Sequence, residues 1–520
     1  MQDEKARSPL ISGDFQGVTG ILAGSGTSEK MMEVKMTGNL VFKRLKTRGI
    51  CAALAMAGVC TAVYGQGGNP TSATNPFYGS VTAQPVSAEP LRLSLDEAVR
   101  MGLENNLGLK EAENDELALR GEKNEALQEF LPTITVSGGT GIFQHNLAAQ
   151  GFGPGTISKF GALFPNGLPP GLSEITKDDL TQGQINFSQT LFSGPVIAGW
   201  KAAGAAQRVA HFAKMTARGD VVQDVATAYL HAIADGSEVD NAAALVAADQ
   251  VAFEHAHEAH EAGTVANLDE LRARVQLQSQ QQALIVAQNA LEKDLILLKR
   301  EIGVNPGQKM VLTDEAPYSE LALETPEEVK KVAYQDRQDY QNLQNQIVEL
   351  RAVHRAYRSQ RYPTLSFSGF WGVDTVNGSG SHGNFAAIGT LSVPLFREAG
   401  LRGDEEASAA QLAAVTAQLA DLRNHIDEQV RDALLDVAAT GKLVDVARSN
   451  VDLATRALND ETDRVSAGVD DNLPLVDAQA TLAAAQRSLV ESLYQYNISK
   501  LGLARAAGVI ELQYKVYLGQ

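Results

Sequence analysis

Residues 262–304 read AGTVANLDELRARVQLQSQQQALIVAQNALEKDLILLKREIGV, and residues 467–509 read AGVDDNLPLVDAQATLAAAQRSLVESLYQYNISKLGLARAAGV. The two stretches align without a gap at a constant offset of 205. The identical pairs include Ala262/Ala467, Gly263/Gly468, Asn267/Asn472, Leu268/Leu473, Leu277/Leu482, Gln281/Gln486, Leu284/Leu489, Arg300/Arg505, Gly303/Gly508 and Val304/Val509. Each copy predicts a glycine turn followed by an uninterrupted helix, and a long helix precedes each turn. The chain therefore makes one very long helical hairpin twice.

The segments before the two turns predict unusually long helices. Residues 196–305 and 395–473 contain no proline, and the glycine of each turn divides its range. The part before each glycine spans roughly 60–70 residues, or about 100 Å as a helix that rises 1.5 Å per residue. Rods of this length must pack on neighbours along their whole length, through apolar residues three and four positions apart. Examples are Val222, Val225, Ala226, Tyr229, Ala232 and Ile233, and Val430, Ala433, Leu434 and Val437.

Alternating apolar and polar residues predict four strands. These are residues 131–139 (LPTITVSGG), 184–192 (QINFSQTLF), 362–371 (YPTLSFSGFW) and 386–396 (AAIGTLSVPLF). A long loop at residues 140–181 would join the first pair, and a shorter loop at residues 372–384 the second. A helix at residues 94–130, with Ser94 and Glu97 as a capping box, precedes the first pair. Residues 325–361 are its counterpart before the second pair.

Four strands cannot close a barrel, and an open sheet has two exposed edges. Strands of about 9–11 residues with one apolar and one polar face suit a transmembrane β-barrel, and the smallest of these has about 8 strands. Strands would then be pooled from several chains, with Phe187, Leu191, Phe367 and Trp371 facing lipid. The alternative is a small soluble antiparallel sheet packed on the helices.

Composition agrees with long helices rather than one thick core. The chain has 520 residues, more than the usual limit of about 250–300 for a single core, so two large units or an extended assembly is expected. Aromatic residues make up 6% of it. The net charge of −18 argues against a nucleic-acid partner.

The N-terminal region predicts export. A basic segment containing Lys43 and Arg48 precedes a short apolar run at residues 50–63, which together favour a signal peptide at residues 36–65 cut near Gly65. The alternative is a retained anchor. Residues 1–35 are interpreted as an over-long N-terminal extension, and residues 66–90 as a flexible leader. Both cysteines lie in the signal, so the mature chain would have no disulfide. Cys60 is an alternative lipidation site, but Val59 stands where Gly or Ala is preferred.

The chain resembles the TolC-like outer membrane efflux protein family. Three features carry this resemblance: the duplicated order of helix, two strands and hairpin; the LPTITVSGG and YPTLSFSG strands; and the two AG-turn motifs. The resemblance covers residues 91–510. It implies one repeat at residues 91–304, a linker at 305–324, a second repeat at 325–510 and a tail at 511–520. It also implies a homotrimer whose strands form a 12-stranded barrel in the outer membrane and whose helices form a 12-helix barrel in the periplasm.

The resemblance implies a duct that conducts substrates from an inner-membrane pump and its periplasmic adaptor to the exterior. We expect no enzymatic activity and no cofactor, because the chain has no recognisable nucleophile–base pair, GxxxxGK[ST] or GxGxxG motif. The competing interpretation is a periplasmic structural coiled-coil protein without a pore.

The family's hairpin tips carry acidic residues that narrow the pore. By motif position Asp269 and Asp477 match these residues, and Asp470 and Asp471 add charge beside the second turn. The alternative is that they are solvated acids favoured by a helix N-terminus. Val465, Pro474 and Asp470 depart from the family pattern, which puts its closing contacts in doubt. The tip residues expected to contact an adaptor are Ala262, Gly263, Thr264, Ala467, Gly468 and Val469.

A histidine run precedes the first turn. The segment EHAHEAHE contains His255, His257 and His260, a spacing that allows weak binding of a transition metal. Such a run is more commonly a solvated helix face, so we expect no metal site; if the run does bind a metal, metal ions become a candidate cargo.

Overall fold

The computed structural model describes residues 75–81, 85–146, 159, 175–264, 266–314, 318–467 and 472–519. The chain divides into two compact units, Met1–Tyr64 and Gly65–Gln520, and all described residues belong to the second. The predicted extension and signal peptide therefore lie outside the described residues, as do residues 66–74 and 82–84 of the leader.

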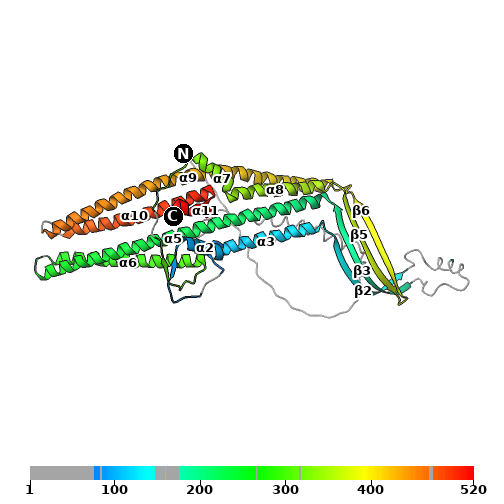
Figure 1. Ribbon diagram of the computed structural model, residues 1–520, viewed down its shortest axis with the longest axis horizontal. Helices are drawn as coiled ribbons and strands as arrows, with labels where there is room; N and C mark the ends of the chain where they lie inside the picture. The colour runs from blue at the N-terminus through cyan, green and yellow to red at the C-terminus, as the bar shows by residue number, and fades with distance from the viewer. Residues whose placement is uncertain are drawn as a thin grey trace, which may run out of the picture. The chain divides into compact units, whose positions relative to one another are not determined.

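Two long helical hairpins form most of the described structure (Figure 1). The first consists of α5 (Gly194–Glu261) and α6 (Asn267–Ile302), and the second of α9 (Glu398–Ser466) and α10 (Asn472–Ala507). Helix α5 begins where Ser193 Oγ accepts a hydrogen bond from the N–H of Val196. It ends before Gly263, whose φ of +75° is the left-handed conformation that favours glycine. The predicted hairpins are thus confirmed for the described residues.

The shorter helices differ from the prediction, because each of the two expected helices is broken into an 11-residue and a 22-residue helix. The first divides into α2 (Leu95–Asn105) and α3 (Leu107–Gln128), and the second into α7 (Pro326–Asp336) and α8 (Gln338–Ser359). Asn106 is extended, 1% exposed, and its side chain caps α3 by accepting from the N–H of Leu109. Arg337 is also extended, and its guanidinium donates to Asp339 and to the carbonyl of Ala506. Both breaks depend on these tertiary and capping contacts.

The main sheet is antiparallel, with strand order β2-β3-β5-β6. Its strands are β2 (Thr133–Asn146), β3 (Ile175–Phe192), β5 (Thr364–Val376) and β6 (Ser381–Ser392). They extend well into both predicted loops, which is a correction. Between β5 and β6 only residues 377–380 remain as a turn, where Asn377 and Gly378 have positive φ. β6 stops earlier than predicted, before Pro394, which has no N–H for a ladder.

A small sheet and a C-terminal helix complete the fold. Strand β1 (Leu91–Leu93) pairs in parallel with β4 (Met310–Leu312), which lies in the expected linker. Helix α11 (Ile510–Leu518) lies in the expected tail and buries Tyr514 and Leu518. A 3-10 helix, η1 (Pro76–Tyr78), lies within the expected leader.

Two apolar clusters form the core. One joins α2, α5, α6, α10 and α11, and the other joins α7, α8, α9 and α10. Small residues permit the close approach of helices: a Cβ added to Gly102 of α2 would lie 2.8 Å from Cγ2 of Val225 on α5. Across the described residues, none of the helices combines the length and apolar character that a membrane crossing requires.

Candidate functional site

The main sheet carries an apolar face that the other described elements do not cover. Ladder partners share a face, and Phe187 and Ile185 lie opposite Gly369 and Trp371. The rings of Phe187 and Phe367 stand 5.6 Å apart between centroids, and the side chain of Trp371 is 60% exposed. Further exposed apolar residues on this face are Ile134, Val136, Phe385 and Leu391.

The opposite face of the sheet is mainly polar in the same segments. Asn186 pairs with Thr135 across the β2–β3 ladder, and its amide donates to Ser137 Oγ at 3.1 Å. Ser188 lies between Thr133 and Ser368. The expected lipid-facing residue Leu191 stands at a β-bulge, where Phe192 takes the place opposite Leu365. One sheet thus separates an apolar surface from a hydroxyl- and amide-rich one.

The first hairpin tip is closed by local backbone contacts. The backbone N–H of Thr264 donates to the carbonyl of Ala259 at 2.9 Å, and its hydroxyl to the same oxygen at 2.8 Å. Asp269 stands in the first turn of α6, where its carboxylate lies 3.4 Å from Arg272 Nη1. An acidic residue in this first turn interacts favourably with the positive end of the helix dipole.

Only two of the three histidines that precede the first turn lie near a common partner, Glu270 of α6. His257 Nδ1 lies 3.0 Å from a carboxylate oxygen of Glu270, and His260 Nε2 lies 3.9 Å from the other. No described contact joins His255 to them. The hydrogen bond to Glu270 raises the pKa of His257. Sequence analysis missed Glu270, although His257 and Glu270 stand six residues before and seven after Gly263, nearly equal distances from the turn.

The second tip is described only in part. The backbone N–H of Ala467 donates to the carbonyl of Asp463 at 3.0 Å. Asp477 is exposed on α10, and its backbone carbonyl accepts from the hydroxyl of Thr481. Gly468, Val469, Asp470 and Asp471, which sequence analysis singled out, lie outside the described residues.

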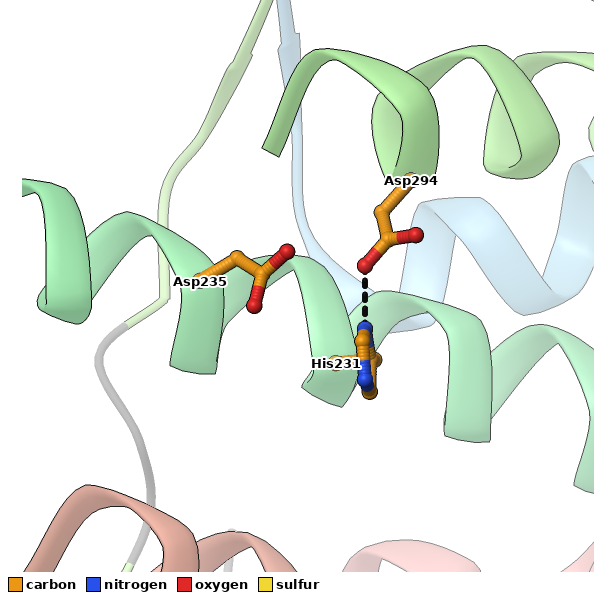
Figure 2. A group of neighbouring side chains, drawn as sticks. All are labelled: His231, Asp235 and Asp294. Atoms are coloured by element: carbon orange, nitrogen blue, oxygen red, sulfur yellow. Dashed lines mark hydrogen bonds and ion pairs between the residues drawn. The ribbon is translucent and has the colours of Figure 1, made fainter. Parts of the chain in front are cut away.

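A polar cluster in the middle of the first hairpin was not predicted (Figure 2). It contains His231 and Asp235 of α5 and Asp294 of α6. His231 stands 32 residues before Gly263 and Asp294 stands 31 after it, so their spacing from the turn places this pair at the same level of the hairpin.

Comparison with known proteins identifies the class of this chain. Residues 98–304 and 331–509, more than half of the chain, match the family described as outer membrane efflux protein. The chain therefore belongs to the outer membrane efflux protein family, whose members are outer membrane channels rather than enzymes. It is a protein of the outer membrane with its helices in the periplasm.

Solved structures show the same fold at low sequence identity. The outer membrane protein VceC from Vibrio cholerae has a TM-score of 0.66 and 18% identity, over 80% of this chain and 96% of that one. The Campylobacter jejuni CmeC outer membrane channel has a TM-score of 0.66 and 14% identity, over 84% and 92%. The Neisseria gonorrhoeae MtrE outer membrane channel has a TM-score of 0.65 and 16% identity, over 83% and 95%. A search of curated protein sequences found no match.

Proposed function

We propose that three copies of this chain form a duct for efflux or type I secretion. The duct would receive substrates from an inner-membrane pump and a periplasmic adaptor and release them outside the cell. The observation that carries the proposal is the open four-stranded sheet, with one exposed apolar face and free edges at β2 and β6.

The strand directions favour closure by copies of the same chain. Neighbouring strands are antiparallel from β2 to β6, so β6 of one copy would meet β2 of the next in antiparallel orientation too. Three copies would give a closed 12-stranded barrel without edges. Its apolar face, including Phe187, Phe367 and Trp371, would contact outer membrane lipid.

The long hairpins support a second barrel below the first. The order helix, strand, strand, hairpin occurs in both halves of the chain, as expected for an internal two-fold repeat. With four long helices from each copy, three copies would supply 12. The tips would contact the adaptor through Ala262, Gly263, Thr264, Ala467, Gly468 and Val469.

Acidic residues at the tips would narrow the pore. Asp269, Asp470, Asp471 and Asp477 would repeat three times around the axis, and such rings of carboxylates attract cations. We expect the double substitution Asp269→Ala and Asp477→Ala to reduce cation block in single-channel recordings. Unchanged conductance and unchanged block would remove these two residues from the pore.

The test of the duct is the mass of the detergent-extracted protein together with its conductance in planar bilayers. We expect a trimer that forms discrete channels. Phe187→Arg should lower barrel stability by about 2–4 kcal/mol if the residue faces the membrane midplane, whereas Ser188→Arg on the polar face is the matched control. A soluble species that never inserts would instead support the periplasmic coiled-coil protein without a pore.

A further inference from the structure

A cleft along the first hairpin contains polar groups that conduction through a duct does not require. Residues of three helices line the cleft: Asp224 and His231 of α5, Asp294 and Glu301 of α6, and Tyr494 of α10. The ring of Tyr494 stands edge-on to His231, with 5.1 Å between centroids. The side chain of His231 is 47% exposed, so a small solute can reach it from solvent.

Three side chains beside this cleft present metal-binding atoms to one another. One ligand atom from each of His231, Asp235 and Asp294 lies within 4.8 Å of the other two. His231 and Asp235 are four residues apart and share a face of α5, and Asp294 reaches toward them from α6 (Figure 2). His231 Nδ1 contacts the Asp294 carboxylate directly. Because metal bonds to such atoms are about 2.0–2.2 Å long, small side-chain rotations would bring all three to one ion.

The cluster is acidic, and among the described residues its histidine is the only basic group that contacts its carboxylates. Among the described residues, neither Asp235 nor Asp294 forms an ion pair with lysine or arginine. Glu238, the next acid along α5, is paired with Arg487 at 2.7 Å. A carboxylate oxygen of Asp235 lies within 4.8 Å of one of Asp294. Two carboxylates held together in this way are stabilised by a cation placed between them.

Unpartnered oxygen atoms give a second, independent indication of a missing ligand. Asp235 Oδ2 is buried, and no described group forms a hydrogen bond with it. Glu301 lines the same cleft two turns along α6, is only 1% exposed, and its Oε2 likewise has no partner among the described residues. Buried polar atoms are normally paired with protein, water or an ion, so an ion bound at the cluster would account for Asp235 Oδ2.

We propose that His231, Asp235 and Asp294 bind one divalent transition-metal ion, which ties α5 to α6 in the middle of the first hairpin. An imidazole combined with carboxylates suits zinc, whereas magnesium prefers a shell made of oxygen atoms alone. The remaining coordination positions would be filled by water from the cleft. All three ligands belong to one chain, so the site does not depend on the duct or on the trimer.

The test is calorimetric titration of the full-length detergent-extracted protein with ZnCl2 after treatment with a chelator, with MgCl2 as the comparison. We expect one zinc ion per chain and no detectable magnesium binding at the same concentration. Loss of residues that only orient a ligand costs about 10–100-fold in affinity, so His231→Ala and Asp294→Asn should each weaken zinc binding by at least about 100-fold. His257→Ala at the tip is the matched control and should retain the wild-type affinity.

A second variant separates metal binding from folding. Asp235→Asn keeps the side-chain shape and removes one of two repelling carboxylates, so its Tm without zinc should equal or exceed that of the wild type. Zinc should raise the Tm of the wild type and not that of Asp235→Asn. No zinc binding by the wild type, retention of binding in His231→Ala, or an equal loss in His257→Ala would each overturn the proposal.

Discussion

The two long hairpins have nearly the same geometry but different interiors. Helices α5 and α9 have 68 and 69 residues, and α6 and α10 have 36 each. Helix α5 ends at Glu261 and α9 at Ser466, again 205 positions apart, and because both helices are unbroken, residues at equal distances from the turns correspond at this offset. At this offset His231, Asp235, Asp294 and Glu301 correspond to Asp436, Thr440, Ser499 and Ala506.

The corresponding positions of the second hairpin satisfy their polar groups locally. The hydroxyls of Thr440 and Ser499 donate to the carbonyls of Asp436 and Gln495, each four residues earlier on the same helix. Ala506 is buried in the apolar cluster. Helix backbone hydrogen bonds are internal to the helix, so the side chains at corresponding positions of the two hairpins can differ without changing the length of the helices. The length of a hairpin and the side chains between its helices are therefore independent properties of this fold.

Glu301→Gln tests the buried acid of the first hairpin and has the largest expected effect. Burial, together with the neighbouring Asp224, raises the pKa of Glu301 to about 8, and Arg300 only partly opposes this. In the unfolded chain this carboxyl ionises near the ordinary glutamate pKa of 4.5. The folded state, which keeps the proton on Glu301 to higher pH, is therefore most stable relative to the unfolded chain below pH 4.5. This contribution to folding stability is lost as the pH rises toward 8.

Between these two pKa values, wild-type stability should fall by about 1.4 kcal/mol for each pH unit because of Glu301. Glu301→Gln should reduce this slope in denaturant unfolding but not abolish it below pH 7, because burial and Asp220 also raise the pKa of Asp224, to about 7. The exposed Glu292 of α6 is the control, and Glu292→Gln should leave the profile unchanged. A wild-type profile that is flat from pH 5 to 8 would contradict the prediction.

Arg300 and Arg505 occupy corresponding positions in the two hairpins, so Arg300→Ala is the matched control for Arg505→Ala. Arg505 forms an ion pair with Asp220 of α5, and their side chains are 29% and 34% exposed, whereas Arg300 is exposed on α6. Breaking a fully buried pair costs about 3–5 kcal/mol. With this much solvent contact we expect about 2 kcal/mol for Arg505→Ala, and less than about 0.5 kcal/mol for Arg300→Ala. Equal losses in unfolding experiments would show that Asp220 does not need Arg505.

Glu270→Gln at the first tip should have the smallest effect. The substitution replaces the carboxylate that bonds His257 and raises its pKa by a neutral amide, which is a weaker acceptor, so this exposed histidine should titrate at lower pH in the variant. Hydrogen–deuterium exchange at the imidazole C2 position, measured by mass spectrometry across a pH series, follows each histidine separately. His255 serves as the internal control. If the pH dependence of exchange at His257 is unchanged in the variant, Glu270 does not form this hydrogen bond in solution.

Several features of the fold were predictable because they depend on neighbours in the chain. The left-handed turn at Gly263, the capping of α2 by Ser94 and the alternation that sets Phe187 apart from Ser188 all follow from local preferences. The strand ends were less predictable. Polar residues lie on both faces in TGIFQHN at the far end of β2 and in ITKDDLTQG of β3. The alternation of apolar and polar residues is therefore lost there, although the strands stay paired.

By itself the sequence determined the hairpins, the apolar face of the sheet and the family, because helical and strand periods and glycine turns are properties of short segments. Only the tertiary structure decided the breaks at Asn106 and Arg337, since each break depends on partners outside its own helix. It also decided that Asp294 meets His231 and that Glu270 meets His257. Spacing from the turn brings such residues to the same level, but how the two helices are rotated against each other determines whether their side chains touch.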